Sequence, residues 1–186
     1  MTDPAFQAMS VDEYLRSEET SPYKREYVAG FVYPLHAQAG VSQPHSLICT
    51  NIAGTLFGAA RRHGCRLHIT DMRLQVGAAM FYPDVMLVCG QETPHALYET
   101  APCVLVEVLS PSTAANDRVG KYAMYTGLPS LQTYLIVEQT QRRVYEYRRQ
   151  GSEWVLREVT GGDTIEIPAL GATLTLDDIY GGVLPA

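Results

Sequence analysis

A short apolar run at residues 104–109 constrains the fold of this chain more than any other stretch of its sequence. The run reads Val-Leu-Val-Glu-Val-Leu, is rich in β-branched residues and is followed by Ser110 and Pro111. A continuous apolar run that ends at a turn signal is typical of a strand buried on both faces of a sheet. We therefore expect the rest of the chain to be organised around this strand.

Two acidic residues interrupt apolar runs of this kind. Glu107 lies in the middle of the run at residues 104–109, and Asp84 interrupts a second run at residues 82–88. Taking a lone carboxylate out of water costs on the order of several kcal/mol, even after the protein relaxes. A cation, a metal ion or a raised pKa must therefore compensate each carboxylate. These two residues are the strongest functional signal in the sequence.

The size and composition of the chain exclude several classes of protein. Its 186 residues suffice for one well-packed domain, which we expect to span residues 1–186. The content of 46% hydrophobic and 18% charged residues argues against a disordered chain or a coiled coil. The net charge of -6 does not suggest a protein coated in nucleic acid, but a local basic patch could still bind a duplex.

The four cysteines are expected to be reduced core residues rather than metal ligands. Cys49, Cys65, Cys89 and Cys103 are far apart and form no C-x-x-C pair. Reduced cysteines favour a cytoplasmic protein, although the sequence leaves a disulfide open. The N-terminus lacks a signal-peptide pattern, and no apolar run approaches the roughly 18 residues of a membrane span. We therefore expect no membrane association.

Hydrophobic periodicity and capping signals predict helices early in the chain and mostly strands later. Ser10 and Glu13 form a capping-box pattern, and the alternating residues around Ala29-Gly30 predict a hairpin at residues 26–33. The further predicted elements are helices at about 10–19, 44–63, 112–126 and 176–180, and strands at about 66–76, 82–88, 102–109, 131–137, 143–148, 154–159 and 165–167. This order predicts a mixed α/β or α+β sandwich.

The two buried carboxylates are predicted to lie close together. Asp84 and Glu107 are 23 residues apart, which suits two neighbouring strands that are joined by a loop and bring both side chains to one edge of a sheet. Paired carboxylates among oxygen ligands suit Mg²⁺ or Mn²⁺. The alternative is a salt bridge to an arginine or lysine in the sheet. Because both residues interrupt apolar runs, the metal-site interpretation is favoured.

The predicted helix after residue 112 adds a candidate lysine. Asp117, Lys121 and Tyr125 follow one another at intervals of four residues and therefore share a helix face. Taken alone, Asp117 and Lys121 would be an ordinary ion pair worth a few tenths of a kcal/mol. The helix directly follows the strand that carries Glu107, however, so we expect its first half to stay near that strand. The Lys121 ammonium could then hold an attacking water or balance phosphate charge.

Several segments together carry a resemblance to a known family. They are Tyr-Pro-Asp-Val at 82–85, Val-Glu-Val-Leu-Ser-Pro-Ser-Thr at 106–113, Asp117 with Lys121 and Tyr125 before Gly-Leu-Pro at 127–129, and Tyr-Leu-Ile-Val at 134–137. Residues 25–30 match loosely an upstream Tyr-Glu-Leu-x-x-Gly element, and His45 matches a helix-opening histidine. In order and spacing, residues 10–150 resemble the Uma-type restriction endonuclease family of the PD-(D/E)XK nuclease superfamily.

The resemblance implies a restriction-endonuclease-like core, in which a mixed sheet is flanked by helices, and a Mg²⁺- or Mn²⁺-dependent hydrolysis of DNA phosphodiester bonds. It also implies that Asp84 and Glu107 are metal ligands, with the backbone carbonyl of Val108 as a further ligand. The superfamily lysine expected two residues after the glutamate is Leu109 here, and the resemblance assigns its role to Lys121. A homodimer is expected as well, because enzymes that cut both strands are often dimers and the C-terminal strands are rich in tyrosine (Tyr134, Tyr145 and Tyr147).

Two further residues have open roles. Glu26 could be another acidic ligand or an exposed strand charge, and His45 could contact phosphate or simply cap a helix. Asp117 and Tyr125 are candidates for substrate contacts. Two other functions compete with that of an endonuclease: a nucleic-acid-binding or assembly module without cleavage, and a small-molecule metal phosphodiesterase.

Overall fold

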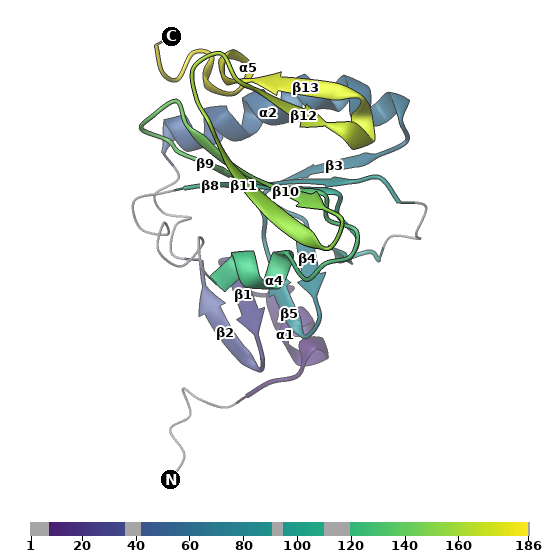
Figure 1. The fold of residues 1–186 in the computed structure, drawn as a ribbon. Coiled ribbons are helices and arrows are strands. Elements are labelled where there is room, and N and C mark those ends of the chain that lie inside the picture. Colours follow the sequence, from purple (N-terminus) through teal and green to yellow (C-terminus); the bar gives the residue numbers. More distant parts are fainter. Residues whose placement is uncertain (1–7, 36–41, 91–94, 110–119, 186) are drawn as a thin grey trace.

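The computed structural model describes residues 8–35, 42–90, 95–109 and 120–185, and its centre is a six-stranded mixed sheet with the order β11-β10-β9-β8-β6-β3 (Figure 1). Strands β8 and β9 are parallel, and all other neighbours in this sheet are antiparallel. The strands are β3 (Arg66–Ile69), β6 (Val85–Val88), β8 (Val104–Val108), β9 (Thr133–Val137), β10 (Val144–Gln150) and β11 (Glu153–Val159).

Strand β8 is buried on both faces, as predicted from its apolar run. All of its residues are buried, and the same is true of the neighbouring strands β6 and β9. Alternate side chains of β8 enter different cores: Val104 and Val106 pack on one side of the sheet, and Leu105 packs on the other. A strand with two apolar faces can only lie between two covering layers.

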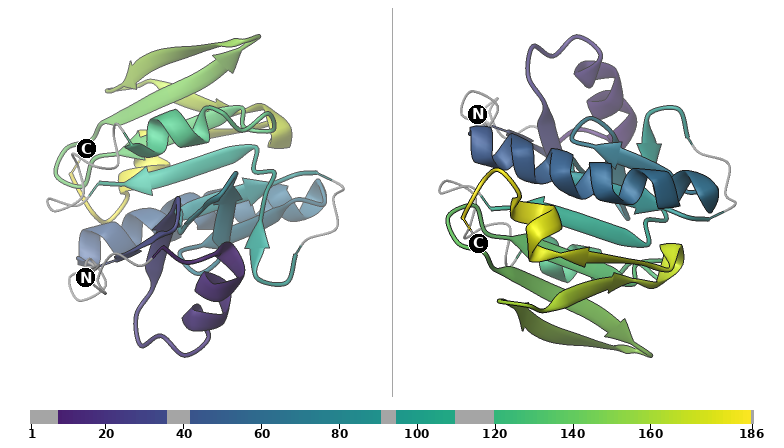
Figure 2. Two further views of the ribbon diagram at one scale, coloured as in Figure 1. Left: turned by 90° about the horizontal axis from the view of Figure 1, so that it is seen from below. Right: turned by 90° about the horizontal axis from the view of Figure 1, so that it is seen from above.

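The first covering layer consists of the long helix α2 (Gln43–Arg62) and a C-terminal hairpin. Figure 2 shows α2 running across the large sheet beside β12 (Thr164–Ile167), β13 (Ala172–Thr175) and α5 (Leu176–Tyr180), with the short η4 (Pro168–Leu170) between the two hairpin strands. The predicted apolar stripe of α2 is confirmed, because Ile48, Ile52 and Leu56 are buried against the sheet. Burial of this stripe holds the N-terminal end of α2 against the ends of β6 and β8.

The second covering layer is a smaller sheet with the order β2-β1-β5-β4-β7. It is built from β1 (Arg25–Val28), β2 (Phe31–Pro34), β4 (Arg73–Val76), β5 (Ala79–Phe81) and β7 (Tyr98–Glu99), and it is accompanied by α1 (Val11–Glu18) and α4 (Tyr122–Tyr125). Phe81 and Tyr125 pack edge to face, with ring centroids 5.4 Å apart, in the core that also contains Leu105. The mixed α+β fold predicted from the sequence is therefore confirmed.

A buried ion cluster ties the two sheets together. Glu99 of β7 accepts hydrogen bonds from Arg66 of β3, at 2.7 Å from Nε and 2.9 Å from Nη2. His68, also on β3, lies 3.0 Å from the same carboxylate. Burial alone would raise the pKa of Glu99. The hydrogen bonds and charges of Arg66 and His68 lower the pKa by more than burial raises it, so the pKa of Glu99 lies below its usual value.

Local signals predicted several element boundaries correctly. The capping box of Ser10 and Glu13 begins α1, and Ser42 caps α2 by accepting a hydrogen bond from the backbone N–H of His45. The hairpin between β1 and β2 turns at Ala29 and Gly30, whose φ angles are 50° and 94°. Such caps and turns are decided by neighbouring residues, so the sequence alone predicts them.

Other boundaries differ from the prediction. The single strand predicted at 66–76 is divided into β3 and β4, which belong to different sheets and are separated by a turn that includes Thr70 with φ 54°. Strands β5, β7 and β13 were not predicted. The helix predicted from residue 112 begins outside the described residues, and only α4 is described here. In the described part of the chain, no helix is long and apolar enough to cross a membrane.

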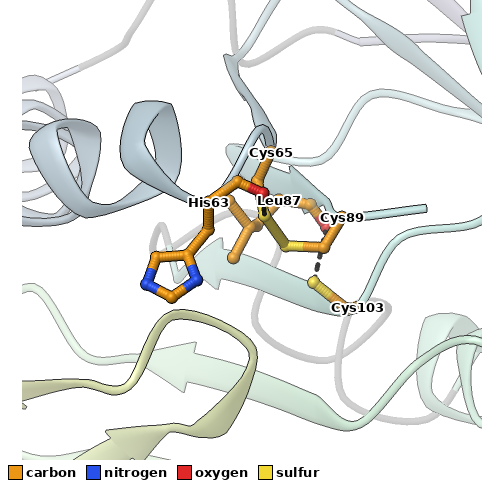
Figure 3. Close-up of a disulfide and its surroundings, with 5 residues drawn as sticks. All are labelled: His63, Cys65, Leu87, Cys89 and Cys103. Carbon is orange, nitrogen blue, oxygen red and sulfur yellow. Dashed lines mark hydrogen bonds between the residues drawn. A yellow bond between two sulfur atoms is a disulfide. The ribbon is translucent and has the colours of Figure 1, made fainter. Parts of the chain in front are cut away.

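The prediction that all four cysteines are reduced is wrong. Cys65 and Cys89 form a disulfide between the segments that flank β3 and β6 (Figure 3). The strand register pairs Arg66 with Val88, which places the two cysteines directly opposite each other. Only this pairing reveals their proximity, because they are 24 residues apart in sequence. The argument for a cytoplasmic protein rested on reduced cysteines and loses that support.

Candidate active site

The structure brings Asp84 and Glu107 to the same end of two adjacent strands, as the sequence predicts. Asp84 directly precedes β6, and Glu107 is the fourth residue of β8. The antiparallel register pairs Val85 with Val106, and its continuation places Asp84 opposite Glu107. The backbone N–H of Val108 donates a hydrogen bond to Asp84 Oδ2 at 2.7 Å, which fixes the carboxylate at this end of the sheet.

His45 reaches Asp84 from the first turn of α2. Its Nε2 lies 3.3 Å from Asp84 Oδ2. Burial tends to lower the pKa of His45, but a hydrogen bond and the charge of Asp84, together with a hydrogen bond to the backbone of Val108, raise the pKa above its usual value. His45 is therefore a partner of Asp84 as well as a residue in the first turn of the helix.

Glu107 is buried, and a cation from another element compensates its charge. The carboxylate is 4% exposed, and both of its oxygens lie 3.2 Å from Lys121 Nζ. The Tyr125 hydroxyl donates a further hydrogen bond to Glu107 Oε1 at 2.9 Å. Burial, and then the charge of Glu107, hold the pKa of Tyr125 well above its usual value, so the phenol stays a neutral donor. The negative charge of this buried carboxylate is therefore compensated by a cation, as predicted, and the cation is a lysine outside the sheet.

Glu26 joins the site from the smaller sheet. Its Oε1 lies 3.1 Å from Lys121 Nζ and accepts a hydrogen bond from the backbone N–H of Tyr82 at 3.4 Å. The Glu26 side chain is only 13% exposed. The alternative of an exposed strand charge is therefore wrong, and Lys121 lies between the carboxylates of Glu26 and Glu107.

The donor set of this site fits a hard divalent cation. The carboxylates of Glu26, Asp84 and Glu107 gather here, and all of these donors are oxygens. Among the described residues of the site, these three carboxylates exceed the charge of the Lys121 ammonium even if the His45 imidazole is protonated. Oxygen ligands with excess negative charge are what Mg²⁺ and Mn²⁺ prefer. Asp117, the remaining predicted site residue, lies outside the described residues.

Sequence reasoning missed Cys49, which lies beside the site. Its Sγ is 3.7 Å from His45 Nδ1, one turn along α2. Burial, and then the charge of Asp84, raise the pKa of the Cys49 thiol. The spacing His45-x-x-x-Cys49, which puts both side chains on one helix face, is the signal in the sequence that could have revealed it.

The fold and the site together define a class of protein. Carboxylates at the ends of adjacent strands, a lysine paired with one of them and helices on the sheet are features of a restriction-endonuclease-like fold. The chain matches the Uma2 family model, described as "Putative restriction endonuclease", over residues 11–177. The protein belongs to this family, as its motifs predicted.

Similar proteins support the same conclusion. The uncharacterized protein slr1290 of Synechocystis sp. strain PCC 6803 is 32% identical over 182 residues, which cover 96% of this chain and 94% of that protein. A second uncharacterized protein of this organism, sll1609, is 32% identical over 159 residues, covering 82% of this chain and 88% of that protein.

A solved structure shows the same fold. It is the crystal structure of "a putative nuclease belonging to DUF820" from Anabaena variabilis, and it superposes with a TM-score of 0.74. The alignment covers 95% of this chain and 99% of that chain, at 17% sequence identity. At this identity the likeness concerns the fold alone.

Proposed function

We propose that this protein is a metal-dependent endonuclease that hydrolyses phosphodiester bonds of DNA. The observation that carries the proposal is the position of Lys121, whose ammonium lies within 3.2 Å of the carboxylates of both Glu26 and Glu107. A buried lysine among acidic residues matches the charge pattern needed to hold both a divalent cation and a phosphate. Membership of a restriction endonuclease family supports this reaction class.

Asp84, Glu107 and the carbonyl of Val108 would hold the ion, with Glu26 as a further acidic ligand. When bound, a divalent ion supplies Lewis-acid polarisation of a phosphate oxygen and activation of a water. The Lys121 ammonium orients the nucleophile or balances charge that develops on the phosphate. Tyr125 holds the Glu107 carboxylate in place through its hydroxyl, and this contact makes Tyr125 a positioning residue.

The environment of Leu109 supports the assignment of the catalytic lysine to Lys121. Leu109 occupies the position where the superfamily signature has its lysine, and it is 4% exposed in a core with Tyr125 and Tyr134. An ammonium at this position would have to enter an apolar core, at a large desolvation cost. Lys121, in contrast, reaches the carboxylates from the segment before α4.

DNA cleavage by matched variants tests this proposal. Plasmid nicking is measured with Mg²⁺, Mn²⁺ and EDTA for the wild type, Asp84→Asn and Lys121→Met. Lys24→Met is the matched control, because Lys24 and Lys121 are the only lysines of the chain and Lys24 pairs instead with Asp71. We expect metal-dependent cutting in the wild type and in Lys24→Met, and loss of cutting in the two site variants.

A binding module without cleavage is the second candidate function. Leu109 at the signature position and the net charge of -6 favour it, because both weaken the likeness to an active DNA-cutting enzyme. In that case the wild type fails to nick DNA with either metal but retards DNA in a gel shift. Cutting that persists in Asp84→Asn would instead show that the proposed metal ligands are wrong.

We further propose that the protein forms a homodimer. Strand β11 lies at an edge of the large sheet and exposes Val155 and Leu156, by 41% and 53%. The tyrosines named from the sequence contribute less than expected, because Tyr134 is fully buried within the protomer. Light scattering coupled to size exclusion tests this proposal, and a mass of one protomer, about 20.5 kDa, contradicts it.

A further inference from the structure

Three side chains of different chemistry meet on the α2 side of Asp84. His45, Cys49 and Asp84 offer a nitrogen, a sulfur and an oxygen, and these ligand atoms all lie within 4.8 Å of one another. His45 Nε2 is 3.3 Å from Asp84 Oδ2, and Cys49 Sγ is 3.7 Å from His45 Nδ1. Such a group, gathered from a helix and a strand end, is a typical ligand set for a metal ion.

The helix holds two of these ligands in a fixed relation. His45 and Cys49 are four residues apart on α2, so both side chains point from the same helix face. Ser42 caps the helix three residues before His45, and Ile48 and Ile52 anchor it in the core. Asp84 is held in turn by the backbone N–H of Val108. The cluster therefore depends on well-packed elements.

The ligand types decide which ion this group would take. Thiolate and imidazole are poor ligands for Mg²⁺, whereas borderline ions such as Zn²⁺ and Co²⁺ bind nitrogen, sulfur and carboxylate oxygen together. We infer that His45, Cys49 and Asp84 form a second metal site for Zn²⁺ or Co²⁺, beside the oxygen site of Asp84 and Glu107. The inference does not depend on nuclease activity.

The separations suit such an ion after small side-chain movements. Tetrahedral zinc with Zn–N of about 2.0 Å and Zn–S of about 2.3 Å needs ligand atoms roughly 3.3–3.6 Å apart. With one ring nitrogen of His45 as the ligand, the 3.3 Å between Nε2 and Asp84 Oδ2 already matches. All three ligand atoms lie within 4.8 Å of one another, so no pair must close by more than about 1.5 Å. Three protein ligands leave a fourth position for water or substrate. On binding, the Cys49 thiol releases its proton to solvent as the sulfur–metal bond forms.

Cobalt spectroscopy tests the site directly. Co²⁺ is added to the 186-residue, disulfide-intact protein, whose oxidation is checked by a count of two free thiols, Cys49 and Cys103. Thiolate ligation gives a charge-transfer band in the near ultraviolet, and tetrahedral geometry gives visible bands. We expect one equivalent of Co²⁺ to produce both, and one equivalent of Zn²⁺ to displace it.

Two cysteine variants provide a matched comparison. Cys49→Ser should lose the charge-transfer band, whereas Cys103→Ser should keep it, because Cys103 is the other buried free thiol and bonds instead to the carbonyl of Leu87. Circular dichroism checks that both variants fold. His45→Gln, at a more exposed position, should weaken Co²⁺ binding and gives a second test. A wild type without the band, or a Cys49→Ser variant that retains it, overturns the inference.

Glu107→Gln separates this inference from the proposed nuclease function. Glu107 is not a ligand in the cluster, so this variant should lose DNA cutting but keep the cobalt–thiolate band. A protein that never cuts DNA yet shows the band contradicts the nuclease proposal alone. Loss of the band in Glu107→Gln would show that the ion sits between Asp84 and Glu107, and the second site would be refuted.

Discussion

Reduction of the Cys65–Cys89 disulfide should lower the free energy of unfolding substantially. The bond closes a loop whose ends are 24 residues apart. A crosslink of this span lowers the conformational entropy of the unfolded chain and so raises the free energy of unfolding by about 3.5 kcal/mol at 25 °C. For a chain of this size, each kcal/mol shifts the melting temperature by roughly 2–4 °C, so reduction should lower it by about 10 °C.

Thermal unfolding with and without dithiothreitol measures this effect. Both cysteines are partly exposed, so the reductant can reach them without global unfolding. The Cys65→Ala/Cys89→Ala variant serves as the control, because it should melt near the reduced wild type and should not respond to the reductant. The assay is run in EDTA, so that metal binding does not contribute to stability.

The disulfide should leave the candidate active site intact. Cys89 follows the last residue of β6, whereas Asp84 precedes the first, so the bond and the carboxylate lie at opposite ends of this strand. Four free thiols in the untreated protein, or a melting temperature that does not respond to the reductant, would refute the reasoning.

Three further predictions concern buried charged groups. Lys121→Met should lower the free energy of unfolding in urea by about 3 kcal/mol, because it leaves the Glu107 carboxylate buried without its cation. Adding Glu107→Gln should recover most of this loss in stability, whereas additive effects of the two substitutions would contradict the pairing. Tyr125→Phe removes a hydrogen bond to the same carboxylate and should cost about 2 kcal/mol in the same assay, whereas an unchanged midpoint would show that this bond contributes nothing. The lowered pKa of Glu99 means that its contribution to stability is present above the unfolded pKa near 4.5 and is lost as pH falls through the lower folded pKa. In Glu99→Gln, the free energy of unfolding should therefore fall less steeply as pH drops below about 4.5, as measured by urea unfolding at several pH values. An unchanged pH dependence in this variant would refute the reasoning.

Part of the candidate site could be predicted from the sequence, because the signals are local. Asp84 and Glu107 stand out as acidic residues within apolar strands, and a separation of 23 residues suits adjacent strands. The structure confirms that these strands are neighbours, and it shows that they are antiparallel. The catalytic and metal-binding roles of these residues, and the single domain over 1–186, stay predictions.

Other members of the site could not be found in this way. Glu26 lies on a strand of the smaller sheet, and its burial depends on how that sheet packs against the larger one. In the sequence it stands beside Lys24 and Arg25 and looks like a surface charge. Cys49 looks like an ordinary core thiol until α2 is placed beside Asp84.

The sequence by itself determined the local elements of this protein: the buried strand β8, the capped starts of α1 and α2, and the hairpin at Ala29-Gly30. These depend on hydrophobic pattern and on contacts within a few residues. Only the tertiary structure decided the full order of the strands and their register. That pairing joins Cys65 to Cys89 and brings Lys121 between Glu26 and Glu107. The physical reason is that strand patterns specify which face is buried, whereas the partner is chosen by packing between segments far apart in the chain.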